Sequence, residues 1–400
     1  MKVLLIHRDI GTGSVGKIVE DLYYGIKKSG NDCKIAYAVV NKSKSIPAED
    51  LISVCDKKTF MFHALFARIT DRCGFFGSRQ TKKLIDLIES FKPDIINIHT
   101  LYGYWLNIDV LFSYLKTKNI RIISTLHSCW DFTGHCCYFT KANCDKWKTQ
   151  CEHCPEKKDY PSSFLMDNSV ANFRDKSKLF NDCRLLEYVA PSVWIKKCVQ
   201  ESFLKGHAVT VIHNGIDLSS FKRNKSSLSK YGISPEKKII LGVAACWTAR
   251  KGLKDFIELS NFLPLDFQIV VVGVNDKQLK KLPNNIIGIK RTESKNDLAA
   301  LYSNATIFFN PTYEDNYPTV NIEALACGTP IVTYPTGGSP EIVEETGLGK
   351  VIEYKNYQAL IEYAAFVDKN AFEPPIELLR RFSKEKMVEN YLQLFLGKND

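Results

Sequence analysis

Acidic side chains flank a loop and a helix in the segment Asn310–Thr333, which reads NPTYEDNYPTVNIEALACGTPIVT. Glu314 and Asp315 follow an apolar run typical of a buried strand, and Glu323 lies in the helix predicted next. Carboxylates accept hydrogen bonds from the hydroxyl groups of sugars and ribose. The spacing therefore indicates a site for a polyhydroxylated ligand at the end of a strand.

The same helix begins with Thr319 and Val320, directly after Pro318. The first N–H groups of a helix have no partner within it, and the helix dipole favours an anion there, so this helix start could hold a phosphate. A second loop follows a further apolar run, with Gly338 inside Gly337-Gly-Ser339 and Glu341 just beyond. Both loops are predicted to bind the same ligand.

A glycine-rich turn lies near the amino terminus, where Gly11-Thr-Gly-Ser-Val-Gly16 matches the pattern G-x-G-x-x-G. Its reading as a dinucleotide site requires an acidic residue about 20 positions later. The following strand ends Ala36-Tyr-Ala-Val-Val40 without a carboxylate. We therefore expect Gly13, Ser14 and Gly16 to offer backbone N–H groups to a phosphate, with a structural tight turn as the alternative.

Two histidines come at the ends of predicted strands. His127 follows Ser124-Thr-Leu, and His99 ends Asn97-Ile-His. Both positions suit a ligand-facing imidazole, and a structural, hydrogen-bonded histidine is the alternative for each.

Cysteines gather in one short segment, where Cys137, Cys144, Cys151 and Cys154 are spaced C-x6-C-x6-C-x2-C. The final C-x2-C suits a tetrahedral zinc site, and four thiolates would close it as a structural rather than a catalytic site. The alternative is a group of reduced, partly buried thiols.

Apolar runs alternate with helical patterns along the whole chain, which predicts parallel sheets covered by helices on both faces. Expected strands in the first half lie at 2–7, 33–40, 94–99, 121–126, 185–190 and 209–212, with helices at about 18–26 and 110–116. In the second half, strands are expected at 239–244, 267–273, 286–289, 306–310 and 330–334, with helices at 253–262, 298–303 and 319–326.

The polar stretch at 214–236 separates the two series. We therefore predict an α/β protein with two Rossmann-like, doubly wound domains that face a cleft. Residues 1–213 form the first domain, with a Cys-rich insert at about 129–160. A linker follows at 214–236, the second domain spans 237–375, and a helix at 376–400 packs back toward the first. Ligands of such sheets bind beyond the carboxyl ends of the strands.

Composition narrows the class of protein. The 400 residues are 45% hydrophobic and 24% charged, as in a globular protein of two domains. No apolar run reaches the ~18 residues of a membrane span, and the first residues do not read as an export signal. We expect a cytoplasmic protein whose 13 cysteines are reduced. The net charge of +10 favours anionic partners without choosing among them.

These motifs resemble the retaining GT-B glycosyltransferases, specifically glycosyltransferase family 4. The segment from Asp315 to Glu323 is similar to the E-x7-E motif of that family, and Ala-Cys-Gly-Thr-Pro and Gly-Gly-Ser-Pro-Glu follow it as in the family. The resemblance implies that Glu323 binds the donor ribose and that an acidic residue binds the donor sugar. The spacing assigns the sugar contact to Asp315, with Glu314 one residue earlier as the alternative.

The loop Gly242–Gly252 resembles the part of the family in which an arginine and a lysine bind the donor diphosphate. Lys251 matches the lysine, whereas Cys246 stands at the position of the arginine and supplies no positive charge. Arg250 is the substitute that the sequence offers. His127 matches a family histidine that contacts the donor sugar.

The resemblance implies retaining transfer of a sugar from a UDP- or GDP-sugar to a saccharide acceptor, without a metal cofactor. The first half, including Trp130-Asp-Phe-Thr-Gly-His-Cys136, resembles bacterial capsule and exopolysaccharide transferases, so a lipid-linked acceptor is expected. The alternatives are a GT-B sugar-nucleotide epimerase and a non-catalytic, zinc-bearing nucleic-acid-binding protein. The second alternative leaves the acidic motif unexplained.

A basic and aromatic segment is a candidate for peripheral contact with the inner face of the plasma membrane. An ordinary packed helix with a charged outer face is the alternative. The side chains concerned are Arg68, Arg72, Arg79, Lys82 and Lys83, with Phe60, Phe62, Phe66, Phe75 and Phe76 among them.

Overall fold

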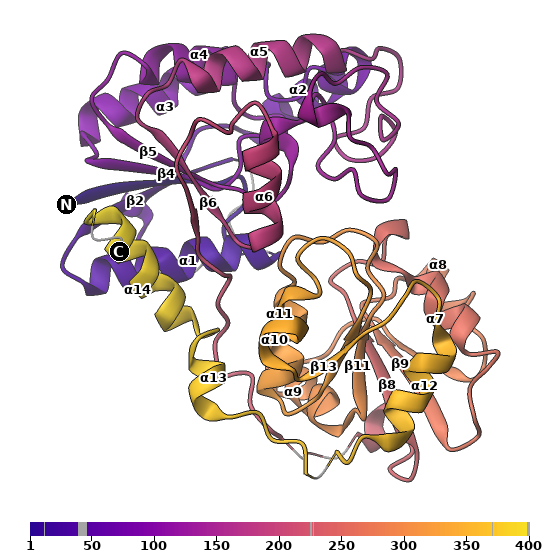
Figure 1. The fold of residues 1–400 in the computed structure, drawn as a ribbon. Helices are drawn as coiled ribbons and strands as arrows, with labels where there is room; N and C mark the ends of the chain where they lie inside the picture. Colours follow the sequence, from indigo (N-terminus) through magenta and orange to yellow (C-terminus); the bar gives the residue numbers. More distant parts are fainter. Residues whose placement is uncertain (12, 39–45, 225, 227, 370, 398–400) are drawn as a thin grey trace. The chain divides into compact units, whose positions relative to one another are not determined.

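The computed structural model describes residues 1–11, 13–38, 46–224, 226, 228–369 and 371–397. The chain forms two compact units. Unit 1 contains residues 1–213 and 388–400, and unit 2 contains residues 214–387. Each unit is an α/β sandwich built on one parallel sheet (Figure 1).

The sheet of unit 1 has seven strands in the order β3-β2-β1-β4-β5-β6-β7, all pairs parallel. The strands are β1 (Lys2–Ile6), β2 (Asp32–Tyr37), β3 (Leu51–Ser53), β4 (Ile95–Ile98), β5 (Arg121–Thr125), β6 (Leu186–Ala190) and β7 (Val209–Val211). The helices are α1 (Gly13–Lys28), α2 (Lys57–Thr70), α3 (Ser78–Phe91), α4 (Ile108–Leu115), α5 (Ser169–Asn181) and α6 (Val193–Glu201).

Helices cover both faces of this sheet. Helices α3, α4 and α5 lie side by side on one face, and α1 lies with α14 (Lys384–Phe395) on the other (Figure 1). A Cβ added at Gly25 of α1 would meet Val388 of α14 at 2.1 Å, so this glycine permits the close approach of the two helices. The register pairs Ile6 with Ile98 and Ile98 with Ser124, so the residues that follow β1, β4 and β5 share one edge of the sheet.

The sheet of unit 2 has six parallel strands in the order β10-β9-β8-β11-β12-β13. The strands are β8 (Lys238–Val243), β9 (Phe267–Val272), β10 (Ile286–Ile289), β11 (Ile307–Asn310), β12 (Ile331–Thr333) and β13 (Gly349–Val351). The helices are α7 (Leu253–Leu259), α8 (Asp276–Leu279), α9 (Lys295–Asn304), α10 (Thr319–Ala326), α11 (Glu341–Thr346), α12 (Tyr357–Phe366) and α13 (Ile376–Arg380).

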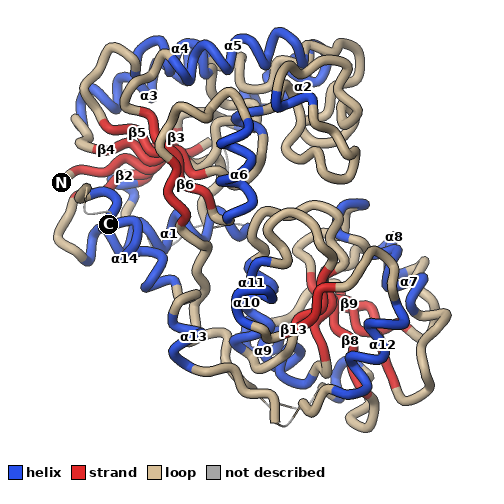
Figure 2. Tube along the Cα trace, viewed as in Figure 1, coloured by secondary structure: helices blue, strands red, loops and turns tan. Residues whose placement is uncertain are grey.

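Strand β8 shows why the apolar runs do not alternate. Ile239 and Leu241 pack into one hydrophobic cluster with α9, α10 and α11, whereas Ile240 packs into another with α7 and α12. Successive side chains of a strand point to opposite faces, and both faces here are covered (Figure 2). A continuous apolar run is therefore what this position in the sheet requires.

Several expected boundaries differ from the structure. Residues 214–236, expected as a linker, belong to unit 2 because Phe221, Leu228 and Ile233 are buried in its core. The helix expected at 253–262 ends at Leu259, and the single helix expected within 376–400 is two helices, α13 and α14. The strand expected to reach Val40 ends at Tyr37, and residues 39–45 lie outside the described part of the chain.

Candidate active site

Two loops at the carboxyl edge of the unit 2 sheet are joined by hydrogen bonds. The backbone N–H of Tyr313 donates to the carbonyl of Arg250 over 2.8 Å. Gly252 has a φ of +75°, and a Cβ there would lie 2.2 Å from the carbonyl oxygen of Pro311. Only glycine allows both this backbone conformation and this approach. The loop that carries Lys251 is thus held against the loop that carries Asp315.

Lys251 and Asp315 form an ion pair between these loops. Burial alone would raise the pKa of Asp315, but the charges of Lys251 and Arg250 outweigh it and lower that pKa. The guanidinium of Arg250 donates to the backbone carbonyl of Glu314, so it fixes the acidic loop. The structure therefore brings Lys251, Arg250, Glu314 and Asp315 together.

The glycine loop after β12 packs on the backbone of Asp315. The N–H of Gly338 donates to the Asp315 carbonyl over 3.2 Å. Gly337 has a φ of +56°, and a Cβ there would lie 1.9 Å from the same oxygen. A buried amide, Asn321, donates to the carbonyl of Ser339 over 3.2 Å and accepts from Asn310 over 2.8 Å. Helix α10 and the Gly337–Ser339 loop are thereby locked together.

Glu323 lies on α10 and accepts a hydrogen bond from the hydroxyl of Tyr302 on α9, over 3.0 Å. Burial raises the pKa of Glu323 to about 7, against the opposing effects of the Tyr302 hydrogen bond and the Lys295 charge. A carboxylate with so high a pKa is poorly solvated, and hydroxyl groups of a ligand would stabilise its charged form. Thr319 and Val320 form the first turn of the same helix, four and three residues before Glu323.

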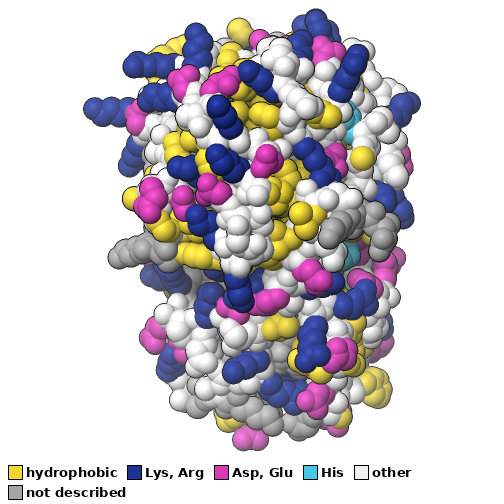
Figure 3. Space-filling view, turned by 90° about the vertical axis from the view of Figure 1, so that its left-hand side faces the viewer, with side chains coloured by type: hydrophobic (Ala, Val, Ile, Leu, Met, Phe, Trp, Pro, Cys, Tyr) yellow, Lys and Arg dark blue, Asp and Glu magenta, His cyan; other side chains and the backbone are white. Residues whose placement is uncertain are grey.

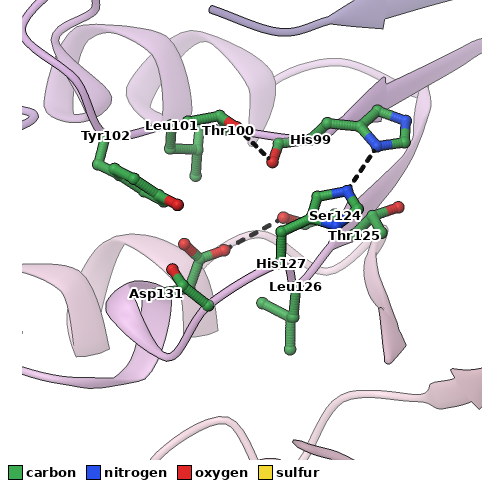
Figure 4. Close-up of a pocket in the computed structure, with 10 residues that line it drawn as sticks. His99, Thr100, Leu101, Tyr102, Ser124, Thr125, Leu126, His127 and Asp131 are labelled. Carbon is green, nitrogen blue, oxygen red and sulfur yellow. Dashed lines mark hydrogen bonds between the residues drawn. The ribbon is translucent and has the colours of Figure 1, made fainter. Parts of the chain in front are cut away.

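A pocket in unit 1 is lined by the end of β5 and by the residues that follow β4 and β5 (Figure 4). His127 is half-buried there, and its Nε2 lies 3.0 Å from Nδ1 of His99. His99 in turn lies 2.8 Å from Oδ1 of Asn97 through its Nε2. Burial lowers the pKa of His127 to about 3 and that of His99 well below its usual value, so both rings are neutral at pH 7.

Asp131 lies at the other side of the same pocket and accepts from the hydroxyl of Ser124 over 3.2 Å. Burial raises its pKa to about 6, although the charge of Lys176 opposes the shift. Lys176 is itself fully buried and donates to the Trp130 carbonyl over 2.6 Å, and burial lowers its pKa to about 8. The bond from Lys176 thus holds the backbone next to Asp131.

The glycine-rich turn leads from β1 into α1. Gly13 begins α1 with a φ of +68°, Ser14 follows it, and a Cβ at Gly16 would lie 2.8 Å from the Asp9 carbonyl oxygen. The tight turn is therefore structural at Gly16, and the phosphate contact expected of Gly13, Ser14 and Gly16 stays a prediction. These residues do not line the His127 pocket but share its edge of the sheet.

The cysteine segment contains a contact that the expected set did not include. The thiol of Cys136 is hydrogen-bonded to Cys154 and lies near Cys151. Cys137 lies near Tyr102 and other tyrosines. Among the described residues, no group of three or more His, Cys, Asp or Glu side chains is arranged to hold a metal ion, and all the cysteines are free. A zinc site formed by Cys137, Cys144, Cys151 and Cys154 stays a prediction.

Sequence reasoning missed three polar residues that support the two sites: Asn97, Tyr302 and Asp131. Asn97 was identifiable in principle, because it is the single amide within the otherwise apolar strand Ile95–Ile98. A polar side chain inside a buried strand must have a hydrogen-bonding partner. Tyr302 and Asp131 carry no comparable signal.

Two glycosyltransferase family models match successive parts of the chain. The model "Glycosyltransferase Family 4" matches residues 58–220, and "Glycosyl transferases group 1" matches residues 224–388. The putative colanic acid biosynthesis glycosyl transferase WcaC of Escherichia coli (strain K12) is 22% identical over 99% of both chains. Among solved structures, sucrose-phosphate synthase of Thermosynechococcus elongatus has a TM-score of 0.72 at 15% identity, covering 99% of this chain and 98% of the other.

This chain is a glycosyltransferase with the GT-B fold. Anabaena HepE, solved in complex with UDP and glucose, also resembles it, with a TM-score of 0.67 at 15% identity over 99% of this chain and 100% of the other. In this glycosyltransferase, the group 1 match contains Lys251, Asp315 and Glu323, and the Family 4 match contains His127.

Proposed function

We propose that this glycosyltransferase moves a sugar, with retention of configuration, from a UDP- or GDP-sugar to a lipid-linked saccharide in bacterial surface polysaccharide biosynthesis. The relative WcaC is named for colanic acid biosynthesis, which supports the pathway class. The structural neighbour HepE in complex with UDP and glucose supports the donor class. The motif resemblance supports retention.

The observation that carries this proposal is the arrangement around Asp315. Lys251 pairs with it, the Gly337–Ser339 loop packs on its backbone, and Glu323 lies on the helix that follows. A donor diphosphate would take Lys251 from Asp315, which would free the carboxylate for a sugar hydroxyl. Glu323 would accept from the ribose. Lys251 and the N–H groups of the loop would stabilise the leaving diphosphate without a metal ion.

A panel of UDP-, GDP- and ADP-sugars tests the donor site by thermal shift. A ligand that binds only the folded state stabilises it by about 2.7 kcal/mol at 100 times its Kd. One nucleotide sugar should raise the Tm of the wild type and of the control Glu362→Ala, and hardly that of Glu323→Ala. Glu362 is an exposed glutamate of α12 in the same unit, so it controls for loss of charge. No shift with any sugar nucleotide would contradict the proposal.

The alternatives are less well supported. Both family models describe glycosyltransferases, so the epimerase is not favoured. On the face in Figure 3, Lys and Arg side chains are interspersed with Asp, Glu and hydrophobic side chains. A nucleic-acid-binding surface would gather its positive charge along a groove or stripe.

Exposed hydrophobic side chains of unit 1 support the proposed contact with a membrane. Four large hydrophobic side chains of α2 are exposed, among them Phe62 at 60% and Leu65 at 55%. The segment that contains Leu165, exposed at 72%, runs beside the end of α2, because the Phe164 N–H donates to the Arg68 carbonyl over 2.7 Å. Such a contiguous apolar surface suits the acyl boundary of a bilayer that presents a lipid-linked acceptor. No described helix is long and apolar enough to cross a membrane.

Sedimentation with vesicles that contain phosphatidylglycerol tests this surface. Phe62→Ser with Leu65→Ser should lower the bound fraction, whereas Phe366→Ser should not. Phe366 is 89% exposed in unit 2, so its replacement removes comparable apolar area elsewhere. Equal binding of all three proteins would contradict the assignment. Four other residues of the segment have intramolecular contacts: Arg72 pairs with Asp175, and Phe60, Phe75 and Phe76 pack against the core.

A further inference from the structure

The hydrogen bonds around His127 determine which of its two nitrogens carries the proton. The series of hydrogen bonds begins at Asn97, which is fully buried on β4. Its Nδ2 donates to the carbonyl of Ile123 over 3.0 Å. That bond fixes the orientation of the amide, so Oδ1 points to the opposite side and acts only as an acceptor.

His99 must therefore donate through Nε2 to Oδ1 of Asn97, at 2.8 Å. Burial, and then the neighbouring His127 and His7, lower the pKa of His99, so the ring is neutral and has a single N–H. With that proton on Nε2, Nδ1 of His99 is a bare acceptor. The orientation of the Asn97 amide therefore determines that the nitrogen of His99 facing His127 carries no proton.

Nε2 of His127 lies 3.0 Å from that acceptor and must donate to it. The two rings are nearly parallel, with an interplanar angle of 19°, and their centroids are 5.3 Å apart. His127 is also neutral, because burial lowers its pKa to about 3. Its one proton is used toward His99, so Nδ1 carries a lone pair and no proton in the pocket of Figure 4.

We propose that Asn97 and His99 are positioning residues that hold His127 in the Nε2–H tautomer, so that Nδ1 accepts a hydrogen bond from a hydroxyl of the bound sugar. The sugar contact rests on the proposed function, whereas the tautomer does not. A group that can only accept rejects a ligand carbonyl or phosphate oxygen at this point. It favours a hydroxyl, and it leaves that hydroxyl with its own lone pairs for other partners.

The first experiment reads the tautomer directly. In protein labelled with 15N-histidine, long-range 1H–15N correlation spectra distinguish a bare ring nitrogen from a protonated one. His127 is assigned by the loss of its signals in His127→Asn. The wild type should show a bare Nδ1 and a protonated Nε2. A protonated Nδ1 would overturn the proposal, whether or not the chain transfers sugar.

The second experiment uses matched variants to test the hydrogen bond from His127 to His99. His99→Asn places an amide oxygen near the former Nδ1 and keeps an acceptor for His127, whereas His99→Leu removes it. A net hydrogen bond is worth a factor of about 3 to 10, so kcat/KM for the donor should fall by that factor in His99→Leu and recover in His99→Asn. His63→Leu is the control, because His63 is buried in the same unit, on α2, and bonded to the Tyr104 carbonyl over 3.2 Å.

Monodeoxy donors identify the hydroxyl that His127 contacts. They also distinguish loss of that contact from a general loss of folded protein. At one ring position the wild type should prefer the hydroxylated donor by about 10-fold, and His99→Leu should lose most of that preference. A general loss of folding would reduce turnover of all donors alike. If His99→Leu kept every deoxy penalty of the wild type, the sugar contact would be overturned. If no donor bound to any variant, the proposed function would fail while the spectra still decided the tautomer.

Discussion

The two candidate regions hold their polar groups by opposite means. In unit 2, charged groups compensate one another: Lys251 pairs with Asp315, and Arg250 holds the Glu314 carbonyl. In unit 1, burial keeps the imidazoles of His7, His99 and His127 neutral, and a hydrogen bond joins His99 to His127. A diphosphate needs positive charge, whereas sugar hydroxyls need oriented neutral partners. The two regions therefore offer a ligand different chemistry: paired charges in unit 2 and oriented neutral groups in unit 1.

The largest expected effect comes from removing the positive charge. Lys251→Ala should lower kcat by at least about 100-fold, because charge stabilisation of a leaving group acts mainly in the transition state. Lys254→Ala, an exposed lysine on α7, should be almost unchanged. Steady-state kinetics on both variants, with circular dichroism to check folding, make the measurement. Equal activity of the two variants would show that catalysis does not depend on the charge of Lys251, and the contrast between the units would lose its functional meaning.

A steric change tests whether the loop geometry around Asp315 matters as much as its charge. Gly337→Ala places a Cβ 1.9 Å from the Asp315 carbonyl oxygen, at a φ of +56°. We expect a loss of about 2–4 kcal/mol in the free energy of unfolding and a clear increase in the KM of the donor. Gly347→Ala also has a positive φ, +68°, but its Cβ meets nothing within 4 Å, so it should cost only about 1 kcal/mol.

Denaturant unfolding and donor kinetics compare these two variants. An equal loss of unfolding free energy at both glycines would mean that backbone strain, not the contact with Asp315, accounts for the loss at position 337. A high KM in Gly337→Ala without loss of stability would show that the loop moves while the core of unit 2 keeps its packing.

The charged region has a clearer signal in the sequence than the neutral one. Lys251, Asp315 and Glu323 stand in loops and a helix at a spacing that resembles a family motif, and the structure pairs Lys251 with Asp315. The two parallel sheets were also predictable, because strands buried on both faces must be apolar throughout. The function of Asn97 depends on an amide orientation set by the Ile123 carbonyl, which only tertiary structure reveals.

The cysteines show a related limit. Cys136 and Cys137 are neighbours in sequence, and spacing alone gave the choice of Cys137. In the folded chain the Cys136 thiol is hydrogen-bonded to Cys154, a contact that the spacing did not indicate. Spacing within an irregular segment says little about which side chains meet, whereas spacing along a helix or strand defines a face.

A moderate effect is expected from pH, and it belongs to unit 2. The pKa of Glu323 is about 7, so its ionised fraction falls about tenfold between pH 8 and pH 6. Donor affinity should fall by about that factor, and Glu323→Gln should have weaker but nearly pH-independent binding. Isothermal titration calorimetry at the two pH values gives both affinities. A pH-dependent affinity that persists in Glu323→Gln would assign the titration to another group.

The same carboxyl affects stability with the opposite sign. Its pKa is raised from 4.5 to about 7 on folding, so the folded state binds more protons between these values. The free energy of unfolding should therefore fall as pH rises through this window. Glu323→Gln removes this cost, and we expect it to stabilise the free protein at pH 8 by on the order of 1–3 kcal/mol.

The smallest change with pH is expected in unit 1, where the buried histidines of the folded protein should not take up protons. Burial lowers the pKa values of His7, His99 and His127, and the mutual repulsion of their charged forms adds to the shift at His7 and His99. Their imidazole C–H chemical shifts should stay constant from pH 8 to pH 5.5, while free imidazole added as a reference titrates. The unfolded rings accept protons near pH 6.5, so acid lowers the free energy of unfolding by up to about 1.4 kcal/mol per histidine and pH unit. A His127 signal that titrates near pH 6.5 would show that unit 1 offers a charge rather than a neutral acceptor, and the contrast between the two regions would disappear.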